Sequence, residues 1–365
     1  MSRLFQGKRI LITGACGTVG AELTRQLLTD PRYDPDEVIG LDNNESALFF
    51  LDQAYLEVPQ ARFFVADVRH GDELSRKFKG VDIVFHAAAL KHVVLCERSP
   101  EQAVETNIVG VQNVIAAANA NDVETVIFTS SDKAVNPTNV MGTSKLMGER
   151  LMTAANSCKR DRGPVFASTR FGNVLGSSGS VIPIFHNQIA KGGPVTVTDR
   201  RMTRFVMSIT EAVRLVIDSA CKARGGEVFV TKMPVLRIPD LAQAMIELLA
   251  SDYGHDPTAI ELVEIGVKPG EKLYEELMSD EEVRRTCELE HYFSVLPAFR
   301  GIYHDIAYDY EDLVSTSLAS AYVSDDEEPL SLVEIKALLG EHGLLEKPEE
   351  STARRYWPGD KEQKS

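Results

Sequence analysis

Cysteine and long apolar runs are scarce in this chain of 365 residues. Its five cysteines are scattered and odd in number, and no two have the spacing of metal ligands. We therefore expect reduced thiols and no metal site. No apolar run reaches the roughly 20 residues that span a bilayer, and no signal peptide precedes the first apolar segment. These absences predict a cytoplasmic protein with no membrane partner.

Positive charge is also in short supply. Lysine and arginine number 39 against 54 aspartates and glutamates, which gives a net charge of −15 and a pI of about 5.1. This balance argues against nucleic acid or an anionic membrane as a partner, although a small anion could still bind in a locally basic cleft. The length, with 44% hydrophobic residues, is ample for a full core and favours two lobes.

Short apolar runs alternate with helical patterns in the first half of the chain. The predicted strands are 8–13, 37–42, 62–67, 81–89, 124–130 and 164–172, and the predicted helices are 17–28, 44–57, 98–120 and 141–157. Strands rich in valine, isoleucine and phenylalanine between helices indicate a parallel sheet covered on both faces. Right-handed crossovers then predict an α/β protein with a Rossmann-like, doubly wound parallel sheet.

The amino-acid composition changes after Gly172, where glycine, proline and serine become frequent. We predict an NAD-binding domain over 1–172, to which a segment at about 206–231 returns. Residues 173–205 and 232–340 would form a smaller C-terminal substrate-binding lobe. The charged end, 341–365, is expected to be flexible.

The stretch "TGACGTVG" predicts a dinucleotide site. It places Gly14, Gly17 and Gly20, with Thr18 and Val19 between them, at the junction of the first strand and the first helix. Glycines there allow a tight turn and a close approach of a pyrophosphate to backbone N–H groups. A glycine turn without a ligand is the alternative, but the full series of strand–helix units that follows favours the cofactor.

Acidic and small residues end the next three strands. Asp42 could accept from both hydroxyls of an adenosine ribose and would repel a 2′-phosphate; since Asn43 and no arginine follows, we expect NAD rather than NADP. Alternatively, Asp42 only caps the next helix. Asp67 and Val68 fit an adenine contact or a simple turn, and Ala87, Ala88 and Ala89 either let the cofactor lie across the sheet edge or serve packing.

The segment "SSDKAVNPTNVMGTSK" (130–145) contains candidate acid–base residues. Asp132 and Lys133 are adjacent where the fifth strand ends, at the edge of a parallel sheet that binds ligands. A partly buried lysine near a nicotinamide cation would have a lowered pKa and could act as a base, whereas a buried carboxyl near a phosphate could keep its proton and act as an acid. An ordinary surface Asp-Lys pair is the alternative reading.

Several motifs in order resemble a known family. The glycine turn, "HAAALKHV" (86–93), Asn107 and Lys145 resemble the extended short-chain dehydrogenase/reductases. Within them, the 130–145 segment, "RFGNVLGSSGSVIPIF" (170–185), "TVTDRRMTRFVM" (196–207) and "GVKPGEKLYEEL" (266–277) resemble the nucleotide-sugar 4,6-dehydratases of polysaccharide, bacillosamine and legionaminic acid biosynthesis. The likeness runs from about residue 5 to about residue 300.

The resemblance implies a reaction and assigns roles. NAD takes a hydride from C4 of the sugar, water leaves across C5 and C6, and the hydride returns to C6. By this resemblance Lys133 removes the C5 proton, Asp132 protonates the departing C6 hydroxyl and Ser131 bonds the C4 hydroxyl. Lys145 binds the nicotinamide ribose, and the further cofactor candidates are Lys91, Asn107 and Thr129.

Met141 departs from the usual Tyr-x-x-x-Lys pair, because it stands four residues before Lys145. A thioether cannot transfer a proton, so the base for the C4 hydroxyl stays open between Ser131 with a relay, a ribose hydroxyl and water. Members that retain the C5 configuration often have methionine here. The resemblance therefore implies a retaining enzyme that makes 2-acetamido-2,6-dideoxy-D-xylo-hexos-4-ulose, although a core methionine that fills a gap is the alternative.

The candidate substrate contacts combine small, polar and cationic residues. Backbone N–H groups at a helix start and two cations suit a diphosphate, and a glutamate suits a ribose or base. The candidates are Lys91, His92, Asn173, Gly179, Ser180, Val181, Val195, Arg204, Lys268 and Glu271. Family members often have arginine where Lys268 stands, which puts its bidentate role in doubt.

Alternatives remain open at this level. The nucleotide of the N-acetylglucosamine donor could be UDP or GDP. A nucleotide-sugar 4-epimerase shares the fold and cofactor but relies on the missing tyrosine, and a non-catalytic NAD-binding protein would not need the Asp132–Lys133 pair. Relatives form dimers or hexamers, so we expect a homo-oligomer.

Overall fold

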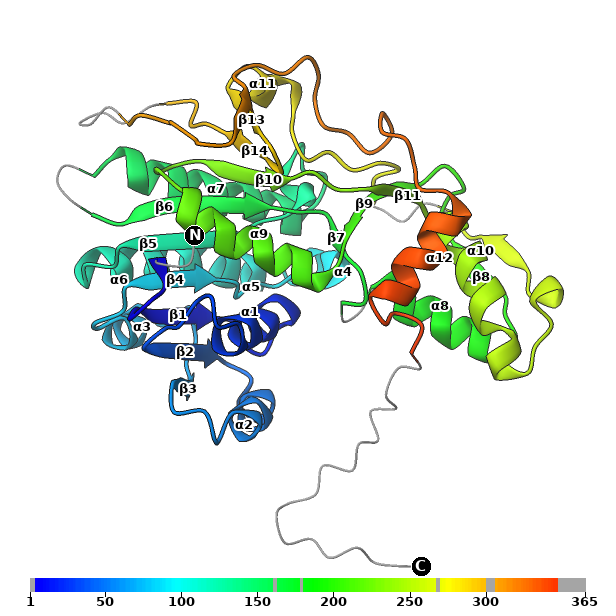
Figure 1. The fold of residues 1–365 in the computed structure, drawn as a ribbon, viewed down its shortest axis with the longest axis horizontal. Coiled ribbons are helices and arrows are strands. Elements are labelled where there is room, and N and C mark those ends of the chain that lie inside the picture. The colour runs from blue at the N-terminus through cyan, green and yellow to red at the C-terminus, as the bar shows by residue number, and fades with distance from the viewer. Residues whose placement is uncertain (1–3, 160–162, 178–179, 267–269, 300–305, 347–365) are drawn as a thin grey trace, which may run out of the picture.

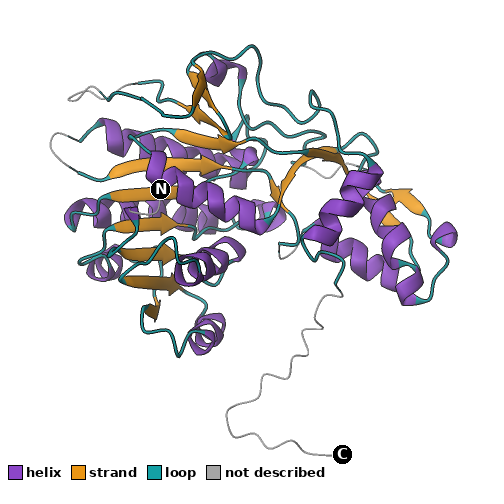
Figure 2. Ribbon diagram, in the orientation of Figure 1, coloured by secondary structure: helices purple, strands orange, loops and turns teal. Residues whose placement is uncertain are grey.

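The computed structural model describes residues 4–159, 163–177, 180–266, 270–299 and 306–346. Two predicted substrate contacts, Gly179 and Lys268, and most of the charged end lie outside the described residues. Strands and helices separate clearly into a large sheet flanked by helices and a smaller helical lobe (Figure 2).

A ten-stranded sheet is the centre of the molecule, with the strand order β3-β2-β1-β4-β5-β6-β10-β14-β13-β15. The strands from β3 to β10 pair in parallel, which confirms the predicted Rossmann-like architecture. Their bounds are β1 Arg9–Thr13, β2 Glu37–Asp42, β3 Ala61–Val65, β4 Ile83–His86, β5 Thr125–Thr129, β6 Val165–Arg170 and β10 Val228–Thr231.

Helices cover both faces of this sheet. Strand β1 shows why, because Ile10 and Ile12 pack into one core while Leu11 packs into the opposite one. Helices α1 and α9 lie side by side on one face, and α3, α6 and α7 lie on the other (Figure 1). The bounds are α1 Thr18–Thr29, α2 Glu45–Ala54, α3 Gly71–Lys77, α6 Gly110–Ala120, α7 Val140–Ser157 and α9 Ile209–Lys222.

The helix predicted over 98–120 is confirmed from Pro100 onward. It runs as α5 (Pro100–Val104), a π-helical turn over Glu105–Val109 and α6, and the separate short helix α4 (Val93–Arg98) precedes it. Proline has no N–H to donate, so it is tolerated at the start of a helix, and Pro100 therefore begins this one two residues later than predicted.

The smaller lobe has its own core and two short sheets, β11-β9-β7 and β12-β8. Its helices α8, α10 and α12 gather at one end of the molecule (Figure 1). The bounds are β7 Asn173–Val174, α8 Val181–Ala190, β8 Val195–Val197, β9 Thr203–Met207, β11 Val235–Arg237, α10 Ile238–Leu249, β12 Leu262–Glu264 and α12 Leu332–Glu341.

Part of the segment expected in the smaller lobe extends the main sheet instead. Strand β14 (Tyr292–Val295) pairs antiparallel with β10, and β13 (Thr286–Leu289) and β15 (Leu313–Ser315) follow, with helix α11 (Asp280–Val283) just before them. These strands are short and the turn between β13 and β14 contains no glycine, proline or asparagine, so the sequence carries little signal for a hairpin. In the described part of the chain, no helix combines the length and apolar character needed to cross a membrane.

Candidate active site

The glycine turn after β1 forms one wall of a cavity of about 180 Å³, which Asp42, Asp67 and the alanines after β4 also line. Gly14 has φ +72°, and a Cβ there would lie 2.7 Å from the Ala88 backbone. A Cβ at Gly20 would lie 2.1 Å from the Gly14 carbonyl oxygen. Only glycine fits these two positions, so the turn is built for close backbone packing.

Helix α1 presents its N-terminus to this turn. Gly17 is the N-cap and Thr18 and Val19 begin the helix, and among the described residues no side chain caps it. The first N–H groups of a helix need acceptors and carry partial positive charge. A pyrophosphate would supply both an acceptor and a negative charge.

Asp42 faces the same cavity, and its carboxylate also holds the local backbone. One oxygen accepts from the Cys16 N–H at 2.9 Å and the other from the Asn44 N–H at 2.9 Å. Asn44, and not Asp42, caps helix α2 by accepting from the Ala47 N–H. The capping alternative for Asp42 is therefore excluded, and Asn43 lies beside it in the cavity wall.

Asp67 combines a turn role with a place in the cavity wall. It accepts from the Arg69 N–H at 3.0 Å and pairs with the Arg69 guanidinium at 2.6 Å. This pairing lowers the pKa of Asp67 to about 2. Val68 lines the cavity beside it.

Asn107 lies in the π-helical turn, and its amide holds the loop that follows β4. Its oxygen accepts from the Leu90 N–H at 2.8 Å, and its nitrogen donates to the Leu90 carbonyl at 3.0 Å and the Ser144 hydroxyl at 2.9 Å. Lys91 and His92 follow on the exposed part of this loop. Asn107 thus fixes the loop that carries two predicted contacts.

Ser131, Asp132 and Lys133 lie together at the end of β5, where a short 3₁₀ turn follows the strand. The Ser131 hydroxyl donates to Asp132 Oδ1 at 2.6 Å, and Lys133 Nζ donates to the same oxygen at 3.1 Å. Asp132 is fully buried, and its other oxygen has no partner in the described structure. A hydroxyl, a carboxylate and an amine therefore meet at one oxygen atom.

Glu275 is a member of this cluster that the sequence did not reveal. Its Oε1 lies 3.3 Å from Lys133 Nζ. Burial lowers the pKa of Lys133, but the carboxylates of Asp132 and Glu275 outweigh burial and raise it above its ordinary value. The lowered pKa predicted for Lys133 is therefore wrong for this structure, because the prediction did not include a second carboxylate.

Lys145 projects from α7 to the end of β5, where its Nζ donates to the Thr129 carbonyl at 2.9 Å. Burial lowers its pKa to about 8. Met141, one turn earlier, is buried against Cys96 and Ala103. This methionine is therefore a packing residue, as its alternative reading proposed.

A second cavity, of about 270 Å³, adjoins Lys133 and contains three predicted substrate residues, Asn173, Arg204 and Glu271. Arg204 Nη2 lies 3.9 Å from Glu271 and donates to the Lys272 carbonyl at 2.9 Å. Asn139, Lys272 and Glu275 also line this cavity and were not predicted. Asn139 lies in the 130–145 segment, whereas Lys272 and Glu275 lie beside Glu271, so only the fold brings these two segments together.

Three other predicted contacts lie in the smaller lobe. Ser180 is the N-cap of α8 and Val181 its first residue. The Ser180 hydroxyl is buried without a partner among the residues described. Val195 is fully buried in the core of the lobe, which leaves its side chain no access to a ligand.

His86 was also missed. It is fully buried at the end of β4, with Nδ1 2.6 Å from the Thr13 hydroxyl oxygen. Burial and the Lys145 charge lower its pKa to about 3, so it is neutral and ties β4 to β1. The sequence pointed to His86 only as the first residue of the segment "HAAALKHV" (86–93).

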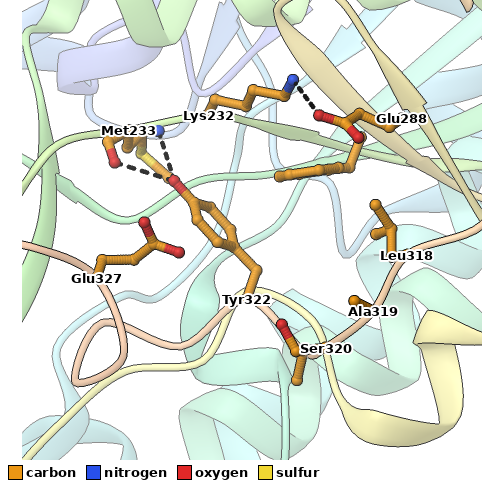
Figure 3. A pocket seen from close by; sticks show the side chains of 10 residues that line it. Lys232, Met233, Glu288, Leu318, Ala319, Ser320, Tyr322 and Glu327 are labelled. Carbon is orange, nitrogen blue, oxygen red and sulfur yellow. Dashed lines mark hydrogen bonds and ion pairs between the residues drawn. The ribbon is translucent and has the colours of Figure 1, made fainter. Parts of the chain in front are cut away.

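A larger hollow, of about 520 Å³, lies between the end of β10 and residues 318–327 (Figure 3). Two contacts cross it: Lys232 pairs with Glu288 at 2.7 Å, and the Tyr322 hydroxyl bonds the Met233 backbone. None of the predicted site residues lines it. We therefore place the candidate active site at the two cavities beside β1, β4 and β5.

Comparison with known proteins agrees with this fold. A family model described as polysaccharide biosynthesis protein matches residues 10–297. An uncharacterized membrane protein of Methanocaldococcus jannaschii is 50% identical over 81% of this chain and 88% of its own length. A UDP-N-acetylglucosamine 4,6-dehydratase (inverting) of Campylobacter jejuni is 38% identical over 83% and 86%, and a UDP-glucose 4-epimerase of Rickettsia felis is 38% identical over 92% and 96%.

Solved structures extend the comparison. Pen from Bacillus thuringiensis has a TM-score of 0.85 and 39% identity, over 93% of this chain and 99% of its own. DesIV, a dTDP-glucose 4,6-dehydratase from Streptomyces venezuelae with NAD bound, has a TM-score of 0.64 and 25% identity, over 73% and 86%.

The parallel sheet, the glycine turn and the lysine of α7 define an extended short-chain dehydrogenase/reductase. Within that class, the chain belongs to the polysaccharide biosynthesis protein family, whose model covers most of its length. The resemblance read from the motifs is thereby confirmed.

Proposed function

We propose that this protein is an NAD-dependent nucleotide-sugar 4,6-dehydratase, a hydro-lyase, that converts UDP-N-acetylglucosamine to 2-acetamido-2,6-dideoxy-D-xylo-hexos-4-ulose for bacterial glycan or nonulosonate biosynthesis. The observation that carries this proposal is the Ser131–Asp132–Lys133 cluster, which joins three proton-transfer groups within hydrogen-bond distance. Lys133 of this cluster lines the cavity that also holds Arg204 and Glu271. The names of the dehydratase relatives support it.

The residues present fit NAD. The cramped Gly14 position and the α1 N-terminus suit a pyrophosphate, and Asp42 at the end of β2 disfavours a 2′-phosphate. Lys145 would hold the nicotinamide ribose. When bound, NAD would supply the hydride acceptor for C4 and the hydride donor for C6.

Besides the hydride, the reaction moves two protons, one from the C4 hydroxyl and one from C5. The cluster can transfer both of them without a tyrosine. Ser131 would pass the C4 hydroxyl proton to Asp132 across the 2.6 Å hydrogen bond. Asp132, now protonated, would give that proton to the C6 hydroxyl as it leaves as water. Lys133, as the neutral amine, would take the C5 proton and return a proton to C5, so every proton taken up is released again.

The C5 configuration is proposed to be retained, because Met141 stands where the retaining members that this chain resembles often have methionine. Its thioether is buried against Cys96 and Ala103. A single base, Lys133, would then both remove and return the proton on one face of the sugar. The inverting relative sets the contrary expectation.

One experiment separates the possible functions. The protein is incubated with UDP-N-acetylglucosamine and NAD in deuterated water, and the sugar is followed by NMR. We expect a 4-keto, 6-deoxy sugar of unchanged C5 configuration with one solvent deuteron at C5. An N-acetylgalactosamine product would establish the epimerase that the Rickettsia relative suggests, and NAD binding without turnover of any nucleotide sugar would establish a binding protein.

A parallel incubation with GDP-N-acetylglucosamine decides the nucleotide. We also propose that the working form is a homo-oligomer, a dimer or a hexamer, which light scattering after size-exclusion chromatography measures directly.

A further inference from the structure

Glu275 is a buried carboxylate between two cations. Its side chain is 3% exposed, and its Oε1 lies 3.3 Å from Lys133 Nζ and 3.7 Å from Arg204 Nε. Its Oε2 is buried and has no hydrogen-bond partner within the described chain. Glu275 also lines the cavity that adjoins Lys133. A buried carboxylate is costly unless it is paired, so its place beside Lys133 requires an explanation.

The backbone of Glu275 is held firmly from a distant segment. Its N–H donates to the Ser324 hydroxyl oxygen at 2.9 Å, and the Ser324 N–H donates to its carbonyl at 2.9 Å. The Ser324 hydroxyl in turn lies 2.8 Å from the Thr203 hydroxyl. Three segments therefore fix the position from which this carboxylate approaches Lys133.

Charges alternate through the cluster. Lys133 is faced by Asp132 from its own turn, by Glu275 from the 270–279 segment and by Arg204 from β9. The two carboxylates attract a proton to Lys133, while burial and Arg204 oppose it. Asp132 is also hydrogen-bonded to Ser131. Glu275 contacts Lys133 but not Ser131, so its charge acts on Lys133 separately from the Ser131 contact.

We propose that Glu275 is a positioning residue of this site: its carboxylate directs the Lys133 amine toward the cavity and stabilises the ammonium group that Lys133 forms when it takes up a proton. The proposal rests on the proposed function for the role of Lys133 in the reaction. In the elimination, the C5–H bond breaks and an N–H bond forms on Lys133, while the proton on Asp132 leaves with the C6 oxygen as water. Burial raises the pKa of Glu275, while the Lys133 and Arg204 charges oppose that rise; as the carboxylate, Glu275 would balance the new positive charge.

Glu275 would make Lys133 a stronger base and would also make its neutral form rarer at neutral pH. Both effects follow from one charge, since a nearby carboxylate shifts a lysine pKa upward by about 1–3 units. Dehydration should therefore rise with pH as Lys133 loses its resting proton. Removing the Glu275 charge should move that rise to lower pH and lower the rate at the plateau.

The test measures Lys133 directly as well as the reaction. Protein labelled with ¹³Cε-lysine is titrated by NMR, and the Lys133 signal is assigned by its loss in Lys133→Arg. We expect Glu275→Gln to lower the Lys133 midpoint by about one unit or more and to shift the rising limb of the kcat–pH profile by the same amount. The control is Glu281→Gln, which neutralises an exposed carboxylate on α11 that pairs with Arg285. It should change neither the Lys133 midpoint nor the kcat–pH profile.

Glu275→Asp keeps the charge and serves if the glutamine variant does not fold. It should keep the Lys133 midpoint within about half a unit of wild type but lower kcat, because its shorter side chain positions the amine less well. An unchanged Lys133 midpoint in Glu275→Gln overturns the proposal. A lower kcat whose rising limb stays at the same pH also overturns it, because that result would indicate a structural role only. If wild-type protein dehydrates no nucleotide sugar, the proposed function fails, while the NMR titration still decides whether Glu275 controls the charge of Lys133.

Discussion

The two cavities of the site are built by different means. Around the glycine turn, backbone geometry does most of the work: Gly14 and Gly20 allow contacts that no side chain permits, and the α1 N-terminus faces the same space. Around Lys133, side chains from the turn after β5, from β9 and from the 270–279 segment form a chain of alternating charges. The first arrangement is local in sequence and the second is not. Substitutions should therefore affect the first through shape and the second through charge.

The largest effect is expected at the charged cavity. Lys133→Ala should lower the dehydration rate by about 10²–10⁴-fold, because it removes the group that takes up the C5 proton. Dinucleotide affinity, measured by calorimetry, should remain, and Lys79→Ala at an exposed lysine is the control. A Lys133→Ala protein that still dehydrates would show that the base is elsewhere.

A larger side chain in the glycine turn should weaken NAD binding and destabilise the protein. Gly14→Ala should weaken NAD binding by about tenfold or more and destabilise the protein by about 1–3 kcal/mol, since its Cβ would meet the Ala88 backbone at 2.7 Å. Gly7 also has a positive φ, +70°, but a Cβ there meets nothing within 4 Å. Gly7→Ala therefore carries only the backbone strain, and its NAD affinity, measured by calorimetry, should equal that of wild type. Equal losses in both variants would mean that crowding at Gly14 is unimportant.

Lys145 on α7, whose Nζ donates to the Thr129 carbonyl at the end of β5, links stability to pH. Burial lowers its pKa to about 8 from 10.5, so between these values the unfolded chain binds a proton that the folded protein does not. Its contribution to the free energy of unfolding should therefore rise with pH over that interval, by about 1–3 kcal/mol. Urea unfolding at about pH 7.5 and about pH 9.5 should show this gain in wild type relative to Lys145→Met. Parallel behaviour of the two proteins would contradict the lowered pKa.

The smallest effect tests whether charge also matters at the glycine turn. Asp42→Asn should lower the preference for NAD over NADP by about tenfold, because the carboxylate that would repel a 2′-phosphate is gone. Calorimetric titration with both dinucleotides measures this ratio. Asp52→Asn, at an exposed position of α2, makes the same change in net charge and should leave the ratio unaltered.

The predicted elements divide according to how local their signals are. Strands β1 to β6 and the glycine turn were predicted because buried parallel strands are continuous apolar runs and because glycine marks a tight turn. The helix predicted over 98–120 begins at Pro100, because proline favours the first position of a helix. Strands β13 and β14 were missed because a short antiparallel pair without a turn signal resembles a loop.

The candidate site divides in the same way. Asp132 and Lys133 were found because they are adjacent in sequence and follow a strand. Glu275 lies in a quoted motif but in no regular element, so no periodicity directs it toward Lys133. The pKa of Lys133 was consequently predicted in the wrong direction, since electrostatic effects depend on distances that the sequence does not contain.

The sequence by itself determined the parallel strands β1 to β6, the glycine turn and the candidate acid–base pair Asp132 and Lys133, because apolar periodicity, glycine and adjacent polar residues act over a few positions of the chain. Only the tertiary structure decided that Met141 packs as a core residue, that Asn107 holds the loop after β4, and that Glu275 lies 3.3 Å from Lys133. In the case of Glu275, the contact joins segments that are more than a hundred residues apart in the chain. They arise when the chain folds, because burial brings together charges that must then be paired.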